Sequence, residues 1–332
     1  MKNPTLDASE QICKGACGAS CQKSQRTGQA PPSETAAGPS DALNSSMAIE
    51  AERRRPVLIA GSGLLHQCNF GPFADWTNLL HEVAHRLRVP FDELHARAYP
   101  TLFWESMLVD AASATGIASH KHEPQCLSTV CEVIRRASQR TVCKRFRELA
   151  ESRRLHAIIN LNFTAVPLTE FSIGPSQLAE GEIVHFQSDV CTIWCPHGHY
   201  SRKRSICISV RKYAALLGKL ENLRREYHKH RKQHPDKTNT SACPAGVGLM
   251  RAVFEHPLVF AGCGLSHSEW TVWWLLATKA RNQARHSTVP SIFVTATDIP
   301  PDQARALERL HCQVKRVETH SAVWDTAEAL GA

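Results

Sequence analysis

Two apolar runs that each end in a glycine turn constrain the fold of this chain more than any other feature of its sequence. Residues 56–60 lead into a Gly-x-Gly turn at residues 61–63, and residues 258–261 lead into another at residues 262–264. A short apolar run that ends in glycine is typical of a buried strand followed by a tight turn. Strands buried on both faces belong to sheets that helices cover. The pattern therefore predicts an α/β protein.

The order of the other patterns predicts a Rossmann-like sheet. Further strands are expected at residues 156–161, 182–186, 191–194, 290–295 and 312–317. Helical patterns occupy residues 268–281, 301–310 and 322–329. Strands that alternate with helices form parallel sheets through helical crossovers. We expect a mostly parallel sheet with helices on both faces.

A mostly helical insertion is expected between the first two strands, over residues 76–155. Asp75 stands where the first of its helices would be capped. Breaks are expected near Pro90, Pro100 and Pro124, because proline ends or kinks a helix.

Residues 1–50 are rich in Gly, Ser, Pro, Gln and Ala and contain almost no aromatic or branched apolar residue. Such a segment cannot bury enough apolar surface to offset the entropy lost on ordering. A disordered tail is expected there, followed by one domain over residues 51–332. Cys13, Cys17 and Cys21 recur in the tail every four residues, but a zinc site would lack its fourth ligand.

The compartment is predicted from what the sequence lacks. No apolar run approaches the roughly 18 residues of a membrane span. The amino terminus also lacks the apolar core of a signal peptide. We expect a cytoplasmic protein with no membrane contact, whose thirteen cysteines are reduced and mostly buried.

The net charge of +8 is concentrated in one stretch. Residues 201–235 hold eleven Lys or Arg and two Glu, and residues 211–232 follow the helical period. One interpretation is a solvated surface helix. The other is a contact for nucleic acid or another acidic partner.

Two polar residues follow strands, at the point where each strand ends. Asn162 follows residues 156–161, and His197 follows residues 191–194. Ligands of open α/β sheets bind at the carboxyl ends of the strands, so we expect both side chains to face one pocket. At this edge of the sheet the side chains of Asn162 and His197 would contribute little to the hydrophobic core. The residues alone also allow a capping Asn162 and a packed, hydrogen-bonded His197.

A zinc cluster is suggested by Cys191, Cys195, His197 and His199. An extended strand through these positions would place all four on one side, too straight to surround one ion. No Cys-x2-Cys pair occurs in the chain either. We therefore expect no metal.

Four segments follow one another along the chain: the Gly61-Ser62-Gly63 turn, Asn162-Phe163, His197-Gly198 and the turn that begins at Gly262. Together with Asp75-Trp76 after the first turn and Arg211-Lys212-Tyr213 after His197-Gly198, they resemble the sirtuin-like family. The likeness is strongest to prokaryotic sirtuin-like effectors of antiphage defence that degrade NAD, and it runs from about Pro56 to the end of the chain. Thr164 and His267 stand where that family usually has aspartate, which alters the expected ribose contacts. Sirtuin deacylases carry two Cys-x2-Cys pairs that bind zinc. This chain has no such pair, which argues against a deacylase activity.

The resemblance implies an NAD glycohydrolase with Asn162 and His197 as catalytic residues. It also implies a set of residues that bind NAD: Gly61, Ser62, Gly63, Asp75, Gly262, Gly264, Leu265 and Ser266. Family analogy further suggests a homo-oligomer and a separate activator, namely an ATPase, an oligomerising sensor or an Argonaute-like protein.

The residue types suit cleavage of nicotinamide from ribose through an oxocarbenium-like state. Asn162 can donate to and accept from a ribose hydroxyl or a water, and His197, with an ordinary pKa of about 6.5, could act as a base near neutral pH. Two alternatives remain open. One is a nucleic-acid-associated regulatory subunit that binds NAD with little turnover, and the other, weaker one is an NAD-dependent deacylase.

Overall fold

The computed structural model describes residues 55–66, 75–140, 144–164, 182–188, 190–234, 245–265, 269–283 and 291–330. The predicted disordered tail and its cysteines lie outside these ranges.

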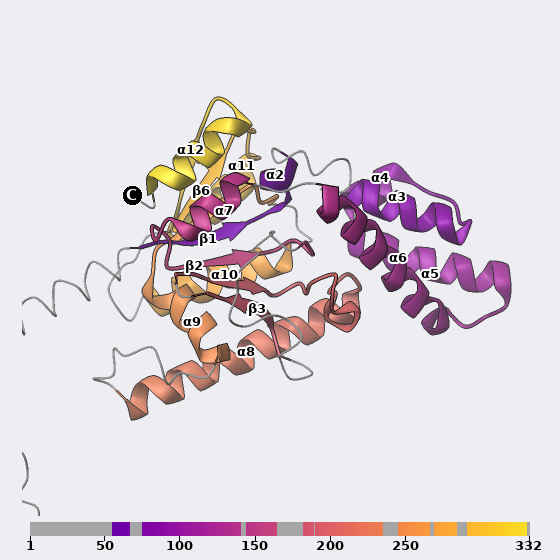
Figure 1. Cartoon of the computed structure of the whole chain (residues 1–332), viewed down its shortest axis with the longest axis horizontal. Helices are drawn as coiled ribbons and strands as arrows, with labels where there is room; N and C mark the ends of the chain where they lie inside the picture. Colours follow the sequence, from indigo (N-terminus) through magenta and orange to yellow (C-terminus); the bar gives the residue numbers. More distant parts are fainter. Residues whose placement is uncertain are drawn as a thin grey trace, which may run out of the picture. The chain divides into compact units, whose positions relative to one another are not determined.

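Within the described residues, seven strands form one sheet in the order β3-β4-β2-β1-β5-β6-β7. Figure 1 labels β3, β2, β1 and β6 of this sheet. The strands are β1 (Val57–Ala60), β2 (Ala157–Asn160), β3 (Val184–Gln187), β4 (Thr192–Cys195), β5 (Leu258–Ala261), β6 (Ser291–Thr295) and β7 (Cys312–Arg316). Every neighbouring pair is parallel except β3 with β4, which is antiparallel. The predicted mostly parallel, Rossmann-like sheet is confirmed.

The order of the strands creates a switch point beside β1. From β1 the chain passes to β2 and β4 on one side, and it then returns to β5 on the other side of β1. Consecutive connections that leave in opposite directions open a crevice at the carboxyl ends of the two central strands. The two glycine turns follow β1 and β5, so both lie at this crevice.

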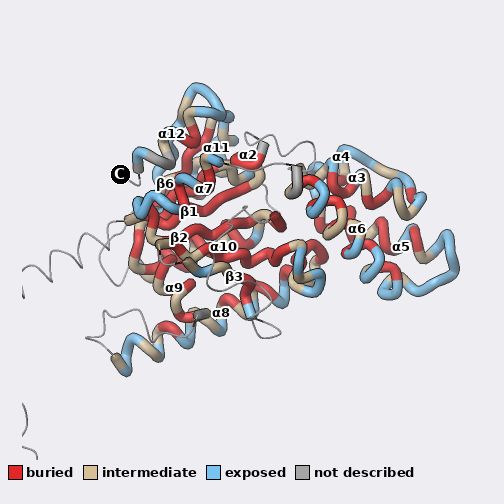
Figure 2. Tube along the Cα trace, in the orientation of Figure 1, coloured by how far each residue is buried: buried red, intermediate tan, exposed pale blue. Residues whose placement is uncertain are grey.

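Alternate residues of the central strands face the two layers of helices. The helices that cover the sheet are α7 (Lys144–Glu151), α8 (Val210–Gln233), α9 (Ala245–Glu255), α10 (Trp270–Gln283), α11 (Pro301–Arg309) and α12 (His320–Leu330). Ile59 and Phe260 pack with residues of α8, α9, α10 and α11, whereas Leu58 and Val259 pack with residues of α7 and α12. Figure 2 shows the strands buried between these layers. The prediction of helices on both faces is confirmed.

The helical insertion has a core of its own. Its helices are α3 (Trp76–Leu87), α4 (Glu93–Ala98), α5 (Pro100–Thr115) and α6 (Ser119–Arg140). Trp104, Met107 and Val130 are buried together in it. Helix α7 also lies between β1 and β2, within the predicted insertion over residues 76–155, but it packs on the sheet through Phe146 and Leu149.

Two local predictions along the chain are wrong. Pro124 lies inside α6 and does not end a helix there. The break comes earlier, at Gly116, whose φ of 69° closes α5 while its N–H donates to Ala112 O at 2.9 Å. Helix α9 is absent from the sequence prediction, although it supplies Val253 and Phe254 to the core.

Helix α8 matches the predicted basic helix over residues 211–232. Ser209 caps it by accepting from Lys212 N at 3.3 Å, and Tyr213 and Leu220 bury its inner face. Part of its positive charge is neutralised locally, since Arg211 pairs with Glu123 at 3.0 Å. None of the helices in the described part of the chain has both the length and the apolar character needed to cross a membrane.

Buried basic groups gather at the amino-terminal edge of the sheet. The rings of His156 and His256 stack with centroids 3.5 Å apart, and His256 Nδ1 donates to Arg55 O at 3.0 Å. Lys279 Nζ donates to His256 O at 2.6 Å and to Val253 O at 2.7 Å. Burial, with a contribution from His256, lowers the pKa of His156 from 6.5 to about 3. Burial likewise lowers the pKa of His256 to about 4.

These shifts predict a loss of stability in mild acid. Between pH 6.5 and about 4 the unfolded chain binds protons that the folded pair does not, so the free energy of unfolding falls as the pH falls through this window. His256→Asn keeps a donor for Arg55 O but removes one titrating group. We expect this variant to lose less free energy of unfolding between pH 7 and pH 4 than the wild type, by an amount on the order of 2 kcal/mol. Urea unfolding at both pH values measures the difference. His85→Asn, at an exposed position, is the matched control and should leave the fall unchanged.

Candidate active site

Four segments that are far apart in the sequence meet at the carboxyl-terminal edge of the sheet. They line a pocket, called here the Asn162 pocket, through Gly61, Ser62, Trp76, Leu161, Asn162, His197, Cys263, Gly264 and Glu269. A second pocket adjoins it, because Trp76, Leu161 and Asn162 line both. Five of the predicted site residues are thus brought together: Gly61, Ser62, Asn162, His197 and Gly264.

The two glycine turns pack main chain against main chain. Gly61 N donates to Ala261 O at 2.9 Å, and Gly63 N donates to Gly262 O at 2.8 Å. A Cβ on Gly61 would lie 2.3 Å from Gly262 O, which no side chain can tolerate. The N–H groups of Gly61 and Gly63 are therefore both used in bonds between the two turns.

Asn162 presents a carbonyl oxygen to the pocket. Its Nδ2 donates to Asn160 Oδ1 at 2.9 Å and to Ala60 O at 3.3 Å, which uses both amide protons. Among the described residues nothing donates to Asn162 Oδ1. Asn160 is fully buried and is held in turn by its own Nδ2, which donates to Thr164 O at 3.0 Å. The geometry thus leaves Asn162 Oδ1 as an acceptor at the pocket.

Asn160 is a site residue that the sequence prediction missed, since it was taken only as the end of a strand. Its Oδ1 accepts from both the N–H and the Nδ2 of Asn162. A buried amide at the last position of a strand, two residues before another amide, was the available signal.

His197 is buried more deeply than expected, with an exposed fraction of 2%. Its Nδ1 lies 2.9 Å from Leu161 O, so Nδ1 carries the proton, and Nε2 accepts from Thr271 Oγ1 at 2.9 Å. The ring packs edge-on against Tyr213. His197 is therefore part of the core, and the expectation that it contributes little to the core is wrong.

Burial lowers the pKa of His197 from 6.5 to about 4, although the bond to Leu161 O opposes this shift. The imidazole is consequently neutral throughout the neutral range. An ionisation of His197 near pH 6.5, which the sequence suggested, does not occur in this environment.

Glu269 is a second residue that the sequence prediction missed. It immediately precedes α10 and lines the Asn162 pocket. Burial raises the pKa of its carboxyl from 4.5 to about 7. Among the described residues no hydrogen bond or ion pair engages this carboxyl. An acid just before a helix is usually a cap, so the sequence alone gave no reason to place it in a pocket.

Thr164 supplies a further polar group in the adjoining pocket. Its Oγ1 is buried and has no hydrogen-bond partner among the described residues. A buried hydroxyl without a partner costs free energy unless a ligand or a water satisfies it. The polar atoms that await a partner thus include Thr164 Oγ1 and Asn162 Oδ1, in one pair of connected pockets.

The structure shows contacts for four of the remaining predicted cofactor residues. Asp75 caps α3 by accepting from Thr77 N at 3.2 Å, and it lines the adjoining pocket. Gly63 and Gly262 hold the paired turns, and the side chain of Leu265 is in the core. Ser266 and His267 lie outside the described residues.

The suggested zinc cluster does not have the expected geometry. The expectation that one extended strand runs through to His199 is wrong, because strand β4 ends at Cys195. His197 and His199 lie in the turn that follows the strand. Burial raises the pKa of the Cys191 and Cys195 thiols to about 12. Within the described ranges, no three His, Cys, Asp or Glu side chains are placed to hold one ion.

Both pockets are narrow as they stand. Each encloses about 20 Å³, roughly the room for one water molecule. A dinucleotide would therefore enter only when the pockets widen.

No protein-family model matches the sequence, and no curated protein matches it either. The function is therefore inferred from the site.

The contact between the glycine turns predicts that alanine substitutions at two glycines of the Asn162 pocket have different effects on stability. Gly61→Ala should lower the free energy of unfolding by about 2 kcal/mol or more, because its Cβ meets a carbonyl oxygen of the opposite turn. Gly264→Ala is the matched control, since a Cβ there meets nothing within 4 Å, and it should change stability by less than about 0.5 kcal/mol. Urea unfolding measures both. Equal effects would contradict the packing of the turns.

Proposed function

We propose that this protein is an NAD⁺ glycohydrolase that releases nicotinamide and ADP-ribose from NAD. The observation that carries the proposal is the convergence of two glycine turns, Asn162 and His197 on one pocket at the switch point of the sheet. Nucleotides bind at such switch points in open α/β sheets. The resemblance to sirtuin-like antiphage effectors supports the same substrate and suggests a role in defence by NAD depletion.

The reaction breaks the bond between C1′ of the ribose and the nicotinamide nitrogen, and water adds to C1′ with loss of one proton. Nicotinamide leaves as a neutral molecule and needs no acid. The protein must orient the ribose and the water and accept the proton. Asn162 Oδ1 is suited to accept a hydrogen bond from the water or from a ribose hydroxyl. Thr164 Oγ1 supplies a second contact where the family usually has a carboxylate.

Glu269 is the group best suited to take the proton. A carboxyl with a pKa of about 7 is half ionised at neutral pH and is a stronger base than an ordinary carboxylate. His197 holds its proton on Nδ1 and its Nε2 is occupied by Thr271. In this arrangement His197 fixes the turn after β4 and the segment after β2 in place beside Asn162.

Asn162→Ala should reduce nicotinamide release by about a hundredfold or more, because it removes the acceptor that orients the reacting groups. Chromatography of reactions with purified full chain and NAD measures the release. Asn222→Ala, at an exposed position on α8, is the matched control and should keep wild-type activity. Wild-type turnover in Asn162→Ala would contradict the proposed role.

The same reactions discriminate the alternative functions. The exposed cations of α8, among them Arg225, Lys229 and Lys232, favour a nucleic-acid-associated subunit as the second candidate. NAD binding without turnover, with or without nucleic acid, would support that candidate. Release of an acyl-ADP-ribose product from an acylated peptide would indicate a deacylase.

The pKa of Glu269 predicts how the rate depends on pH. If its ionised form is the base, nicotinamide release should rise with pH through about 7 and level off above it. Since the pKa of His197 is about 4, His197 adds no inflection between pH 5.5 and pH 9. Glu269→Gln should remove this inflection and lower the plateau by about a hundredfold. Exposed Glu226→Gln should leave the profile unchanged, and an inflection that persists in Glu269→Gln would exclude Glu269 as the base.

A further inference from the structure

A separate cavity of about 680 Å³ lies beside the connection between β4 and α8. Its walls come from the approach to β3, the end of β4 with the turn after it, the loop that precedes α8, and the first turns of α8. None of its lining residues lines the Asn162 pocket. Its volume falls in the range of roughly 300–1,000 Å³ that is typical of small-molecule sites.

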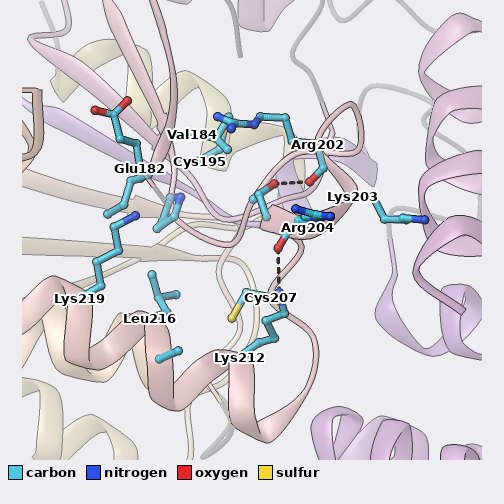
Figure 3. Close-up of a pocket in the computed structure, with 15 residues that line it drawn as sticks. Glu182, Val184, Cys195, Arg202, Lys203, Arg204, Cys207, Lys212, Leu216 and Lys219 are labelled. Carbon is cyan, nitrogen blue, oxygen red and sulfur yellow. Dashed lines mark hydrogen bonds between the residues drawn. The ribbon is translucent and has the colours of Figure 1, made fainter. Parts of the chain in front are cut away.

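Among the residues that the structure describes, five cations and one acid line this cavity. They are Arg202, Lys203, Arg204, Lys212, Lys219 and Glu182. Five positive charges against one negative charge leave an excess of four. Figure 3 shows Lys212 and Lys219 extending from α8, with Arg202 and Arg204 on the wall opposite, whereas Lys203 points away. Lys203 Nζ donates to Ser128 Oγ at 3.0 Å, which holds it but does not neutralise it.

The surroundings of Lys219 disfavour its charged form. Burial lowers the pKa of Lys219, the carboxylate of Glu182 opposes this shift, and the positive charge of Arg202 makes a smaller contribution that lowers the pKa. Lys212 Nζ donates to Arg204 O at 2.7 Å, which keeps a second ammonium group at the cavity. An anion bound between these groups would relieve their repulsion.

The rest of the lining is apolar. Ile183, Val184 and Cys195 are buried at one side, and Ala215 and Leu216 lie on α8. A ligand that fits this lining has a flat or apolar body and an end rich in negative charge. A nucleotide has both, and guanidinium groups bind phosphate oxygens with matching geometry. A nucleic acid strand would instead need cations spread along a surface rather than gathered around one cavity.

We propose that this cavity is a binding site for a nucleotide, held through its phosphates by Arg202, Arg204, Lys212 and Lys219. The binding does not depend on the proposed NAD hydrolysis.

The wall of the cavity is the same loop that carries His197. Cys207 N donates to His197 O at 2.8 Å, and a Cβ on Gly198, whose φ is 94°, would lie 2.2 Å from Ser205 O. The loop is therefore folded tightly on itself, with His197 toward the Asn162 pocket and Arg202 and Arg204 toward the cavity. Resting on the proposed function, the second part of the proposal is that the bound nucleotide is an effector of NAD cleavage.

Isothermal titration calorimetry of the full chain tests the binding, with ATP and inorganic pyrophosphate as probes. Arg204→Gln with Lys219→Met should weaken ATP binding by about tenfold or more, because two charged contacts are lost. Lys229→Met, an exposed cation elsewhere on α8, is the matched control and should bind ATP normally. Arg204→Gln alone, at an exposed side chain, gives the same readout if the double variant does not fold.

Three results would overturn the binding site. One is equal ATP affinity in the double variant and the wild type. Another is an ATP affinity that Asn162→Ala lowers as much as the double variant does, which would place ATP in the Asn162 pocket. The third is binding of a single-stranded oligonucleotide but not ATP, weakened equally by Lys229→Met, which would indicate a nucleic acid surface along α8.

Nicotinamide release with and without saturating ATP tests the coupling. We expect ATP to change the rate by about fivefold or more in the wild type and not in the double variant. ATP binding with no change in rate would keep the site and overturn the coupling. A wild type that binds ATP but never releases nicotinamide would instead contradict the proposed NAD hydrolysis.

Discussion

The main-chain contact between the two glycine turns is the constraint on which the rest of the site depends. Gly61 and Gly63 donate to the carbonyls of Ala261 and Gly262, so the ends of β1 and β5 are joined beyond the sheet itself. Asn162 Nδ2 joins the end of β2 to the same place through Ala60 O. Because these bonds use backbone carbonyls as acceptors, the positions of the strand ends are set by main-chain geometry. Side chains at the pocket are then placed on a rigid frame, which is what a reaction that depends on orientation requires.

Beneath this frame lies a small network of buried polar groups. Asn160 holds Asn162 with one end of its amide and Thr164 O with the other. His197 connects Leu161 O to Thr271 on α10. In a low-dielectric interior such bonds are stronger than in water, and an unpaired member is correspondingly costly. Within the described part of the chain, the oxygens of Asn162 and Thr164 have no partner, so the network is incomplete there until something else binds.

The sequence predicts the parts of this site that depend on strand ends. Asn162 and His197 both follow apolar runs, and parallel strands bring such positions to one edge whatever the rest of the chain does. The ionisation of His197 could not be predicted, because its burial comes from Tyr213 and Thr271, which lie on helices far along the chain. Glu269 was missed for the same reason. Its place before a helix is visible in the sequence, but its desolvation is a property of the assembled pocket.

Local patterns misled where a single residue type was given too much weight. Pro124 is accommodated within α6, and the chain turns at Gly116, where a left-handed backbone conformation is required. The resemblance assigns the glycines of the first turn to NAD binding, and in the structure their lack of a Cβ allows another piece of main chain to approach. A glycine can allow either a ligand or another piece of main chain to approach, and the position of the neighbouring strand determines which of the two it contacts.

The outer strand β7 has a consequence for how copies of this chain could assemble. It is the last strand of the sheet order, and four of its five residues are exposed, including Lys315 and Arg316. Cations on a border strand oppose the growth of a sheet from one molecule into the next, since two such borders repel each other. Copies of this chain are therefore not expected to join through two β7 edges, and the order of the strand ends that form the pocket is not extended on that side of the sheet.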